Sequence, residues 1–308
     1  MEWPKLSMET MIRRLEPPKG HIDIVMDTDT YNEVDDQFAL YYALLSSEKM
    51  TVQAVYAAPF HNFRSEGPED GMEKSYDEIV RLITKMNIKP EGFAFKGSRT
   101  YLPAPGVPVD SPAAQDLIAR AMARPDDDPL YVLELGCITT VASALLMEPR
   151  LVEKIVVIFL GGNTYSWDSA REFNLGQDIP AAQVIFDSGV PLIQLPAMTV
   201  TALLTTSIHE LRACIGGKNE LCDTLIELTA AYYDDHYARS KEIWDIGAVA
   251  FLVNPEWVRS SLVHSPRLSS DGYFSTQDTT RHFIRQAYHI IRDEVFRDLF
   301  DKLSGYKG

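Results

Sequence analysis

Short apolar runs alternate along this chain with stretches of helical periodicity. Residues 130–135 and 155–160 are almost entirely apolar, which is typical of strands that are covered on both faces. A strand that leads into a helix and then into another strand predicts right-handed βαβ units. We therefore expect an α/β fold with a mainly parallel central sheet flanked by helices.

The same pattern gives the expected order of elements. Strands are predicted at residues 22–26, 52–57, 130–135, 155–160, 191–195 and 283–289. Helices are predicted at residues 37–44, 77–84, 139–146 and 179–186, over most of 208–253, and at the end of the chain through Val295, Leu299 and Phe300. No linker-like segment divides the chain. We expect a single domain over residues 1–308, with residues 1–20 as an extended amino-terminal segment.

The charge balance of the chain limits its partners. Lys and Arg number 29 against 44 Asp and Glu, which gives a net charge of −15 at pH 7. Such a charge repels phosphate backbones and anionic lipids, which argues against nucleic-acid polymers and membranes as partners. The three cysteines form no Cys-x-x-Cys motif, and residues 1–20 contain no signal-peptide-like apolar run. We expect a cytoplasmic protein that binds a small molecule or a cation.

Residues 27–36 carry five carboxylates in ten positions, between a predicted strand and a predicted helix. Like charges this close disfavour ionisation unless a cation neutralises them. Oxygen ligands in a flexible loop suit Ca²⁺ or Mg²⁺, with Ca²⁺ favoured. The alternative is that Asn32 caps the helix while Asp35 and Asp36 complement its positive end. The segment alone leaves both interpretations open.

Two other acidic motifs can be compared with this segment. An EF-hand needs Gly at its sixth position and a carboxylate at its twelfth, where this chain has Asn32 and Phe38. A haloacid-dehalogenase-type phosphatase begins with Asp-x-Asp, as at residues 27–29, but has Thr or Val where Tyr31 stands. That motif also leaves the next two aspartates unexplained. The EF-hand is excluded, and the phosphatase remains a weak alternative.

The acidic segment resembles the amino-terminal signature of the inosine–uridine-type nucleoside hydrolases. It consists of Asp-Thr-Asp, a short gap, and Asp-Asp at the start of an apolar helix. Further segments resemble that family in the same order. They are LYVLELGCITTVA at 130–142, FLGG at 159–162, EFN at 172–174, the helix and turn at 180–191, and Trp-Asp at 244–245. Any one of these motifs is weakly specific, but the ordered set is strongly specific.

The resemblance implies a Ca²⁺ enzyme that hydrolyses the N-glycosidic bond of ribonucleosides to ribose and free base. The implied metal ligands are the carboxylates of Asp29, Asp36 and Asp245 and the backbone carbonyl of Leu135. Asp29 is also the implied general base, which removes a proton from the attacking water. Negative charge near the sugar would stabilise the oxocarbenium-like transition state.

The resemblance also implies the residues that bind the substrate. Asp35 would accept hydrogen bonds from the ribose hydroxyls, and Glu172 and Asn174 would hold the sugar from the opposite side. Asn163 is expected to point into the site, and Trp244 to stack on the base. Members of the family are commonly dimers or tetramers, so we expect a homodimer or homotetramer.

The chain departs from the family pattern at two places. Five residues separate Asp29 from Asp35 where the usual signature has three, so residues 31–33 are expected to reach the pocket and alter substrate choice. Trp244 stands where the pyrimidine-accepting branch has His and the purine-preferring branch has Trp, which favours purine nucleosides. The alternative for Trp244 is simple packing in the core.

Two other functions stay open. The altered loop and the missing His can redirect the pocket to another glycoside or to a modified nucleoside. A non-catalytic, calcium-dependent sugar- or nucleoside-binding protein is the second possibility. The complete set of carboxylates argues against that second possibility, because Asp29 would serve both as metal ligand and as base.

Overall fold

The computed structural model describes residues 2–167, 169–275 and 278–308. The strands of its main sheet are β1 (Ile22–Thr28), β2 (Met50–Ala57), β3 (Ala94–Lys96), β4 (Leu130–Glu134), β5 (Ile155–Leu160), β6 (Leu192–Leu195), β9 (Val258–His264) and β12 (Phe283–Ile290). Two short pairs lie outside this sheet, namely β7 (Thr205–Thr206) with β8 (Lys241–Glu242), and β10 (Arg267–Leu268) with β11 (Phe274–Ser275).

The α-helices are α1 (Met8–Leu15), α2 (Asp35–Leu45), α3 (Pro68–Thr84), α4 (Pro112–Met122), α5 (Thr139–Met147), α6 (Phe173–Gln177), α7 (Ile179–Ser188), α8 (Ile208–Ile215), α9 (Glu220–Tyr232), α10 (Ile246–Val253) and α11 (Arg292–Gly305). Short 3-10 helices lie at Pro149–Glu153, Thr201–Leu203 and Pro255–Trp257. Among the described residues, no helix has both the length and the apolar character needed to cross a bilayer.

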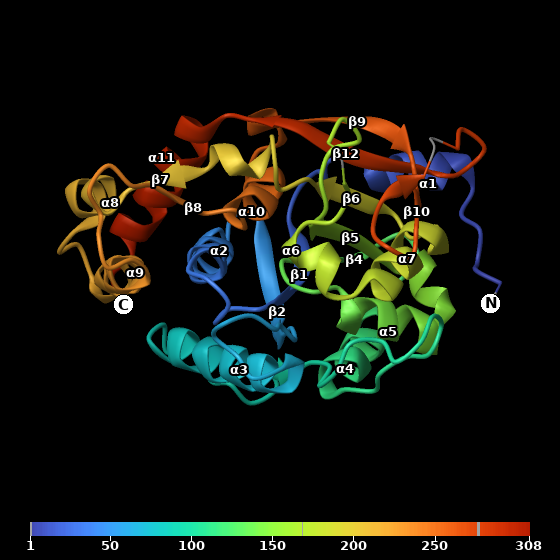
Figure 1. Cartoon of the computed structure of the whole chain (residues 1–308), viewed down its shortest axis with the longest axis horizontal. Coiled ribbons are helices and arrows are strands. Elements are labelled where there is room, and N and C mark those ends of the chain that lie inside the picture. Colours follow the sequence, from blue (N-terminus) through green and yellow to red (C-terminus); the bar gives the residue numbers. More distant parts are fainter. Residues whose placement is uncertain (1, 168, 276–277) are drawn as a thin grey trace.

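The main sheet has the strand order β3-β2-β1-β4-β5-β6-β12-β9 (Figure 1). Every neighbouring pair is parallel except β12 with β9, which run antiparallel at one edge. The expected α/β fold with a mainly parallel sheet is therefore confirmed. The edge strand β9 and the short strand β3 were not predicted, since neither has a long uninterrupted aliphatic run.

Helices cover both faces of the sheet because successive side chains of each strand point to opposite faces. Ile24 and Met26 of β1 pack into a core with α2, α10 and α11. Val25, between them, packs into a second core with α4, α5 and α7. The same alternation recurs in β4, where Leu133 enters the first core and Val132 the second. Burial on both faces explains why the central residues of these strands are apolar.

The amino-terminal segment differs from the prediction. We expected residues 1–20 to be extended, but α1 forms within them and packs against β12. Ser7 caps this helix by accepting a 3.1 Å hydrogen bond from the backbone N–H of Thr10. Met11 and Leu15, four residues apart, bury one face of the helix. The extended assignment was wrong because it overlooked this cap and spacing.

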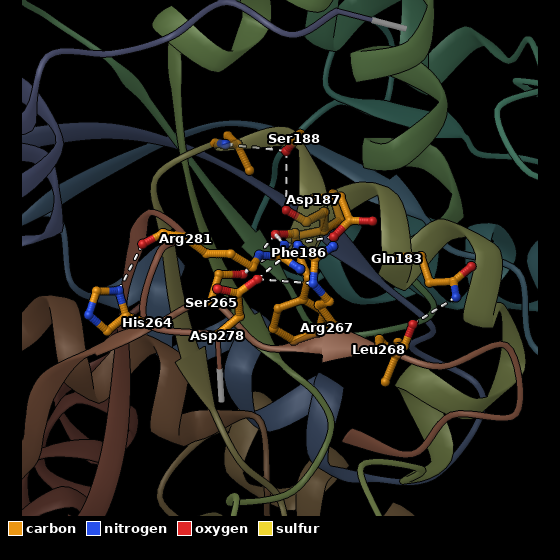
Figure 2. Close-up of polar contacts among 12 residues, drawn as sticks. Gln183, Phe186, Asp187, Ser188, His264, Ser265, Arg267, Leu268, Asp278 and Arg281 are labelled. Atoms are coloured by element: carbon orange, nitrogen blue, oxygen red, sulfur yellow. Dashed lines mark hydrogen bonds and ion pairs between the residues drawn. The ribbon is translucent and has the colours of Figure 1, made fainter. Parts of the chain in front are cut away.

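The carboxyl-terminal strands are tied to α7 by polar contacts (Figure 2). Arg281, just before β12, binds the carboxylate of Asp187 at 2.6 Å and also donates to the carbonyl of Phe186. The hydroxyl of Ser265 donates to the same carbonyl at 2.7 Å. The hydroxyl of Tyr165, in the loop after β5, donates to the carbonyl of His264 at 3.3 Å. This loop is therefore fixed against the end of β9.

Candidate active site

A cavity of about 340 Å³ lies where the parallel strands end. Asp29 and Leu135, directly after β1 and β4, line this cavity. So do Leu160 at the end of β5 and Ala197 two residues after β6. Ligands of open α/β sheets bind at this edge, beyond the carboxyl ends of the strands. All residues to which the sequence assigned a metal-binding, catalytic or substrate-binding role line this one cavity, namely Asp29, Asp35, Asp36, Leu135, Asn163, Glu172, Asn174, Trp244 and Asp245.

Three carboxyl groups meet on one side of the cavity. Asp35 and Asp36 form the first turn of α2, and Asp245 directly precedes α10. Each of the three offers an oxygen atom within 4.8 Å of the other two, an arrangement that can hold a metal ion. Asp29 lines the same cavity without belonging to this close group. The geometry thus adds Asp35 to the carboxylates that can contact a metal, whereas the sequence placed it on the sugar.

The alternative interpretation of the acidic segment is wrong for Asn32, which does not cap the helix, although Asp35 and Asp36 do lie in the first turn of α2, where they can complement its positive end. The residue that precedes α2 is Val34, and no side chain caps the first turn of the helix. The side-chain oxygen of Asn32 instead accepts a 2.6 Å hydrogen bond from the amide of Asn62. Asp245 makes no capping hydrogen bond to α10 either. Capping hydrogen bonds therefore do not account for the burial of these carboxylates.

Burial and mutual repulsion dominate the electrostatics of the cluster. Asp29, Asp36 and Asp245 are nearly inaccessible. Burial, followed by the charge of Asp35, raises the pKa of Asp36 to about 8. Burial and the charges of Asp35 and Asp36 raise the pKa of Asp245 well above its usual range. A bound cation would relieve this repulsion and ionise the group.

Asp29 is fixed by close packing at the end of β1. Its side chain is 1% exposed, and its Oδ2 atom has no hydrogen-bond partner among the described residues. A Cβ atom at Gly136 would lie 3.2 Å from the Cβ of Asp29 and 2.8 Å from that of Ala58. Glycine at this position therefore lets the β4 end approach Asp29. The unpartnered oxygen is available to a cation or a water molecule.

Leu135 and Asn174 form the floor of the cavity. The side-chain amide of Asn174 donates to the carbonyl of Leu135 at 2.7 Å and to that of Leu160 at 3.1 Å. These two carbonyls lie at the ends of neighbouring strands β4 and β5. A carbonyl has two lone pairs, so that of Leu135 can still serve as a ligand.

Glu172 and Asn163 also have structural partners. Both carboxylate oxygens of Glu172 accept backbone N–H groups, from Asn174 at 2.8 Å and from Gly162 at 2.8 Å. Burial raises the pKa of Glu172 to about 7 although these hydrogen bonds lower it. The amide of Asn163 donates to the carbonyl of Ser169 at 2.9 Å and accepts the N–H of Met198 at 3.3 Å. Asn163 thus links two loops at the edge of the cavity.

The longer loop after Asp29 reaches the cavity through two of its residues. Asn32 and Glu33 line the cavity, as expected from the departure in spacing, whereas Tyr31 lies under the guanidinium of Arg64. The carboxylate of Glu33 binds Nζ of Lys241 at 2.6 Å. Sequence reasoning missed Lys241, because no local motif marks a lysine that meets a loop more than two hundred residues away.

Apolar side chains form the opening of the cavity. Trp244 and the partly exposed Trp167, Phe173 and Met198 line it, together with the exposed Arg171. Trp244 was predicted from the sequence to line the site, but Phe173, Met198 and Arg171 were missed. Phe173 and Arg171 flank Glu172 in the sequence. Their position next to a predicted site residue could have indicated that they line the cavity.

Comparison with known proteins indicates the family to which the chain belongs. The family model described as "Inosine-uridine preferring nucleoside hydrolase" matches residues 68–287. The chain is 27% identical over 266 residues to the pyrimidine-specific ribonucleoside hydrolase RihA of Enterobacter sp. (strain 638), a match that covers 76% of this chain and 80% of that protein.

Solved structures show the same fold. A plant nucleoside hydrolase, the PpNRh1 enzyme, is 19% identical with a TM-score of 0.71, and the match covers 94% of this chain and 100% of that one. A purine-preferring ribonucleoside hydrolase from Gardnerella vaginalis is 20% identical with a TM-score of 0.70, covering 92% and 98%. The family match spans most of the chain and includes the segments that carry Glu172, Asn174 and Asp245. The protein therefore belongs to the inosine–uridine preferring nucleoside hydrolase family and is an N-glycosyl hydrolase.

Proposed function

We propose that this enzyme uses calcium to hydrolyse the N-glycosidic bond of ribonucleosides, with a preference for purine nucleosides. One observation carries the proposal. Buried carboxylates from the end of β1, the start of α2 and the start of α10 line a single cavity, and three of them approach within 4.8 Å. A cavity of about 340 Å³ is the right order of size for a nucleoside.

The donor set fits a calcium ion. The proposed ligands are the carboxylates of Asp29, Asp36 and Asp245 and the carbonyl of Leu135, all oxygen donors, which Ca²⁺ prefers over nitrogen or sulfur. The unpartnered Oδ2 of Asp29 and the raised pKa of Asp36 both indicate that positive charge is needed here. When bound, calcium would lower the pKa of a coordinated water.

Residues of the cavity would also activate water and bind the substrate. Asp29 accepts the proton of the attacking water as general base. Asp35 accepts hydrogen bonds from the ribose hydroxyls, while Glu172, Asn174 and Asn163 bound the other side of the sugar. The surrounding carboxylates favour the positive charge that develops on the ribosyl group as the bond to the base breaks.

The preference for purines rests on Trp244. This indole lines the cavity immediately before Asp245, and a bicyclic base offers it more stacking area than a pyrimidine. The names of similar proteins do not decide between purine and pyrimidine substrates, since one relative is called pyrimidine-specific and one solved structure is called purine-preferring. One observation favours the alternative substrate class, another glycoside or a modified nucleoside, because Asn32 and Glu33 of the longer loop line the cavity.

A substrate panel tests the proposal. Purified enzyme is incubated with purine and pyrimidine ribonucleosides, with calcium or with a chelator, and the released base and reducing sugar are measured. We expect purine nucleosides to be cleaved fastest, and only with calcium. Binding of nucleosides without any cleavage would favour the non-catalytic alternative, and inactivity on every standard nucleoside would favour a different glycoside.

The Asp29→Asn variant tests the assignment of the general base. Loss of a general base typically reduces turnover by roughly a hundredfold to ten-thousandfold, and Asp29→Asn should also bind calcium more weakly. Asp23→Asn is the matched control, because Asp23 lies on β1, the strand that leads to Asp29, and pairs with Arg124 at 2.7 Å outside the cavity. Normal turnover by Asp29→Asn with calcium bound would refute the assignment.

We further propose a cytoplasmic enzyme that forms one domain and assembles as a homodimer or homotetramer. The main sheet takes strands from residues 22–290, which supports one domain. The free thiols of Cys137 and Cys222 are buried, which fits a reducing compartment. Light scattering after size-exclusion chromatography would give the oligomeric state, and a single cooperative unfolding transition is expected for one domain.

A further inference from the structure

Arg171 brings a positive charge to a cavity whose other charged residues are acidic. It is the only cationic side chain among the described residues that line the cavity, whereas six lining residues carry carboxyl groups. Within the described part of the chain, its guanidinium forms no hydrogen bond or ion pair, and only its backbone N–H donates, to the hydroxyl of Ser169 at 3.0 Å. A guanidinium carries five N–H donors. These donors are therefore available to a ligand of the cavity.

The stem of Arg171 is packed against two glycines. A Cβ atom at Gly176 of α6 would lie 3.0 Å from Cγ of Arg171 and 3.4 Å from its Nε. A Cβ atom at Gly272, between β10 and β11, would lie 3.3 Å from the Cβ of Arg171. The stem therefore occupies space that only glycine leaves open at both positions. Such packing restricts the rotamers of Arg171 before a ligand binds, which reduces the entropy lost on binding.

Aromatic side chains line the opening of the cavity together with Arg171. They are Trp167, Phe173 and Trp244. A nucleobase stacks well on such rings, whereas the hydroxyls of ribose need polar partners, which the carboxyl groups on the other side of the cavity provide. A nucleoside whose sugar contacts these carboxyl groups would place its base at the opening, within the same set of side chains as the guanidinium.

We propose that Arg171 binds the base and selects 6-oxopurine nucleosides, such as inosine and guanosine, over adenosine. A guanidinium can donate two parallel hydrogen bonds to neighbouring acceptors, and N7 and O6 of a 6-oxopurine form such a pair. Adenosine has an amino donor in place of O6, so one N–H group of the guanidinium would lose its partner. This inference rests on the proposed function and narrows its preference for purines.

The same contact would assist the departure of the base. The oxygen of water bonds to C1′ of the ribose and a proton passes to Asp29, while the electron pair of the C1′–N9 bond passes to the base. Negative charge then develops on the purine ring, and charged hydrogen bonds to N7 and O6 stabilise it. Trp244, which precedes Asp245, cannot supply a positive charge for this purpose. Arg171 supplies the charge but not the proton, because arginine stays protonated in proteins, so the base takes its proton from solvent.

The test measures kcat/KM of the wild-type enzyme, Arg171→Gln and Arg171→Lys with three substrates in the presence of calcium. The substrates are inosine, adenosine and 4-nitrophenyl riboside, whose leaving group departs readily as a phenolate and has neither N7 nor O6. Arg171→Gln should lower kcat/KM for inosine by at least about fivefold, adenosine should be affected clearly less, and the 4-nitrophenyl riboside should be unaffected. Arg171→Lys keeps the charge but lacks the planar fork, so it should retain only part of the selectivity for inosine.

Arg259→Gln is the matched control, because Arg259 is an exposed arginine on β9 that does not line the cavity. It should leave all three substrates unaffected. Equal losses for the three substrates in Arg171→Gln, or no loss for inosine, would overturn the inference.

Wild-type inactivity on every nucleoside would instead refute the proposed function. Calorimetry would then still test Arg171, since the wild type should bind inosine more tightly than adenosine and Arg171→Gln should bind the two alike. Equal affinities in the wild type would overturn the inference.

Discussion

The side-chain amide of Asn174 donates a 2.7 Å hydrogen bond to the backbone carbonyl of Leu135. Through this contact, the first turn of α6 is attached to the end of β4 at the floor of the cavity. The same amide donates to the carbonyl of Leu160 at 3.1 Å, so one side chain fixes the ends of two neighbouring strands.

Asn174→Ala should therefore destabilise the protein and impair the site together. Two buried carbonyls would lose their donor, and an unsatisfied buried group costs about 1–3 kcal/mol. We expect the free energy of unfolding, measured by urea denaturation, to fall by that order, and kcat/KM to fall as well. Asn254→Ala is a useful control, because Asn254 accepts the N–H of Glu256 at 3.1 Å near a 3-10 helix outside the cavity. Unchanged stability and activity of Asn174→Ala would contradict the role of this amide.

Gly136→Ala tests the close approach at Asp29. The added methyl group would lie 2.8 Å from the Cβ of Ala58 and 3.2 Å from that of Asp29, so the strand ends must separate. Overpacking of this kind costs about 1–3 kcal/mol, and displacement of Asp29 should reduce kcat. Gly305→Ala is the control, since a Cβ atom there meets nothing within 4 Å. Thermal unfolding and turnover of both variants check the prediction, which fails if Gly136→Ala behaves like the control.

The stability of the metal-free protein should decrease as pH rises. Burial raises the pKa of Asp35 to about 6, against the effect of Lys241, and that of Asp36 to about 8. A carboxyl group whose pKa is higher in the folded state holds its proton more tightly there. Its stabilising contribution is complete below its unfolded pKa of about 4 and is lost as pH rises through the folded value.

We therefore expect Tm in the presence of a chelator to fall between about pH 5 and about pH 8. Calcium binds the ionised carboxylates, so its stabilising effect should grow over the same range. Differential scanning calorimetry with and without calcium measures both trends. A metal-free Tm that rises over this range, or a calcium effect that is larger at the acidic end, would contradict the assignment of these carboxylates.

Trp244→Ala tests the choice of base. Loss of a stacking partner should lower kcat/KM for purine nucleosides by roughly twofold to tenfold, and pyrimidine nucleosides should be affected less. Chromatographic measurement of released base, with one purine and one pyrimidine nucleoside in competition, gives the ratio directly. Trp257→Ala, which alters a tryptophan that packs outside the cavity, is the control. An equal loss for both nucleosides would leave Trp244 with a packing role only.

Much of the site follows from short stretches of sequence. Asp29 comes directly after an apolar strand, and Asp35 and Asp36 open an apolar helix, so their place at the carboxyl edge of the sheet follows from local periodicity. The cap and spacing of α1 are equally local signals, and they were overlooked when residues 1–20 were expected to be extended.

Contacts between distant segments were decided only by the tertiary structure. Lys241 meets Glu33 although the two are far apart in the sequence. Asp245 meets Asp35 and Asp36 because α10 packs against α2. Periodicity and helix signals arise from steric and hydrogen-bonding preferences of neighbouring residues, so the sequence displays them directly. Which charges become buried together depends on the packing of the whole chain, because burial and pairing are properties of the folded state alone.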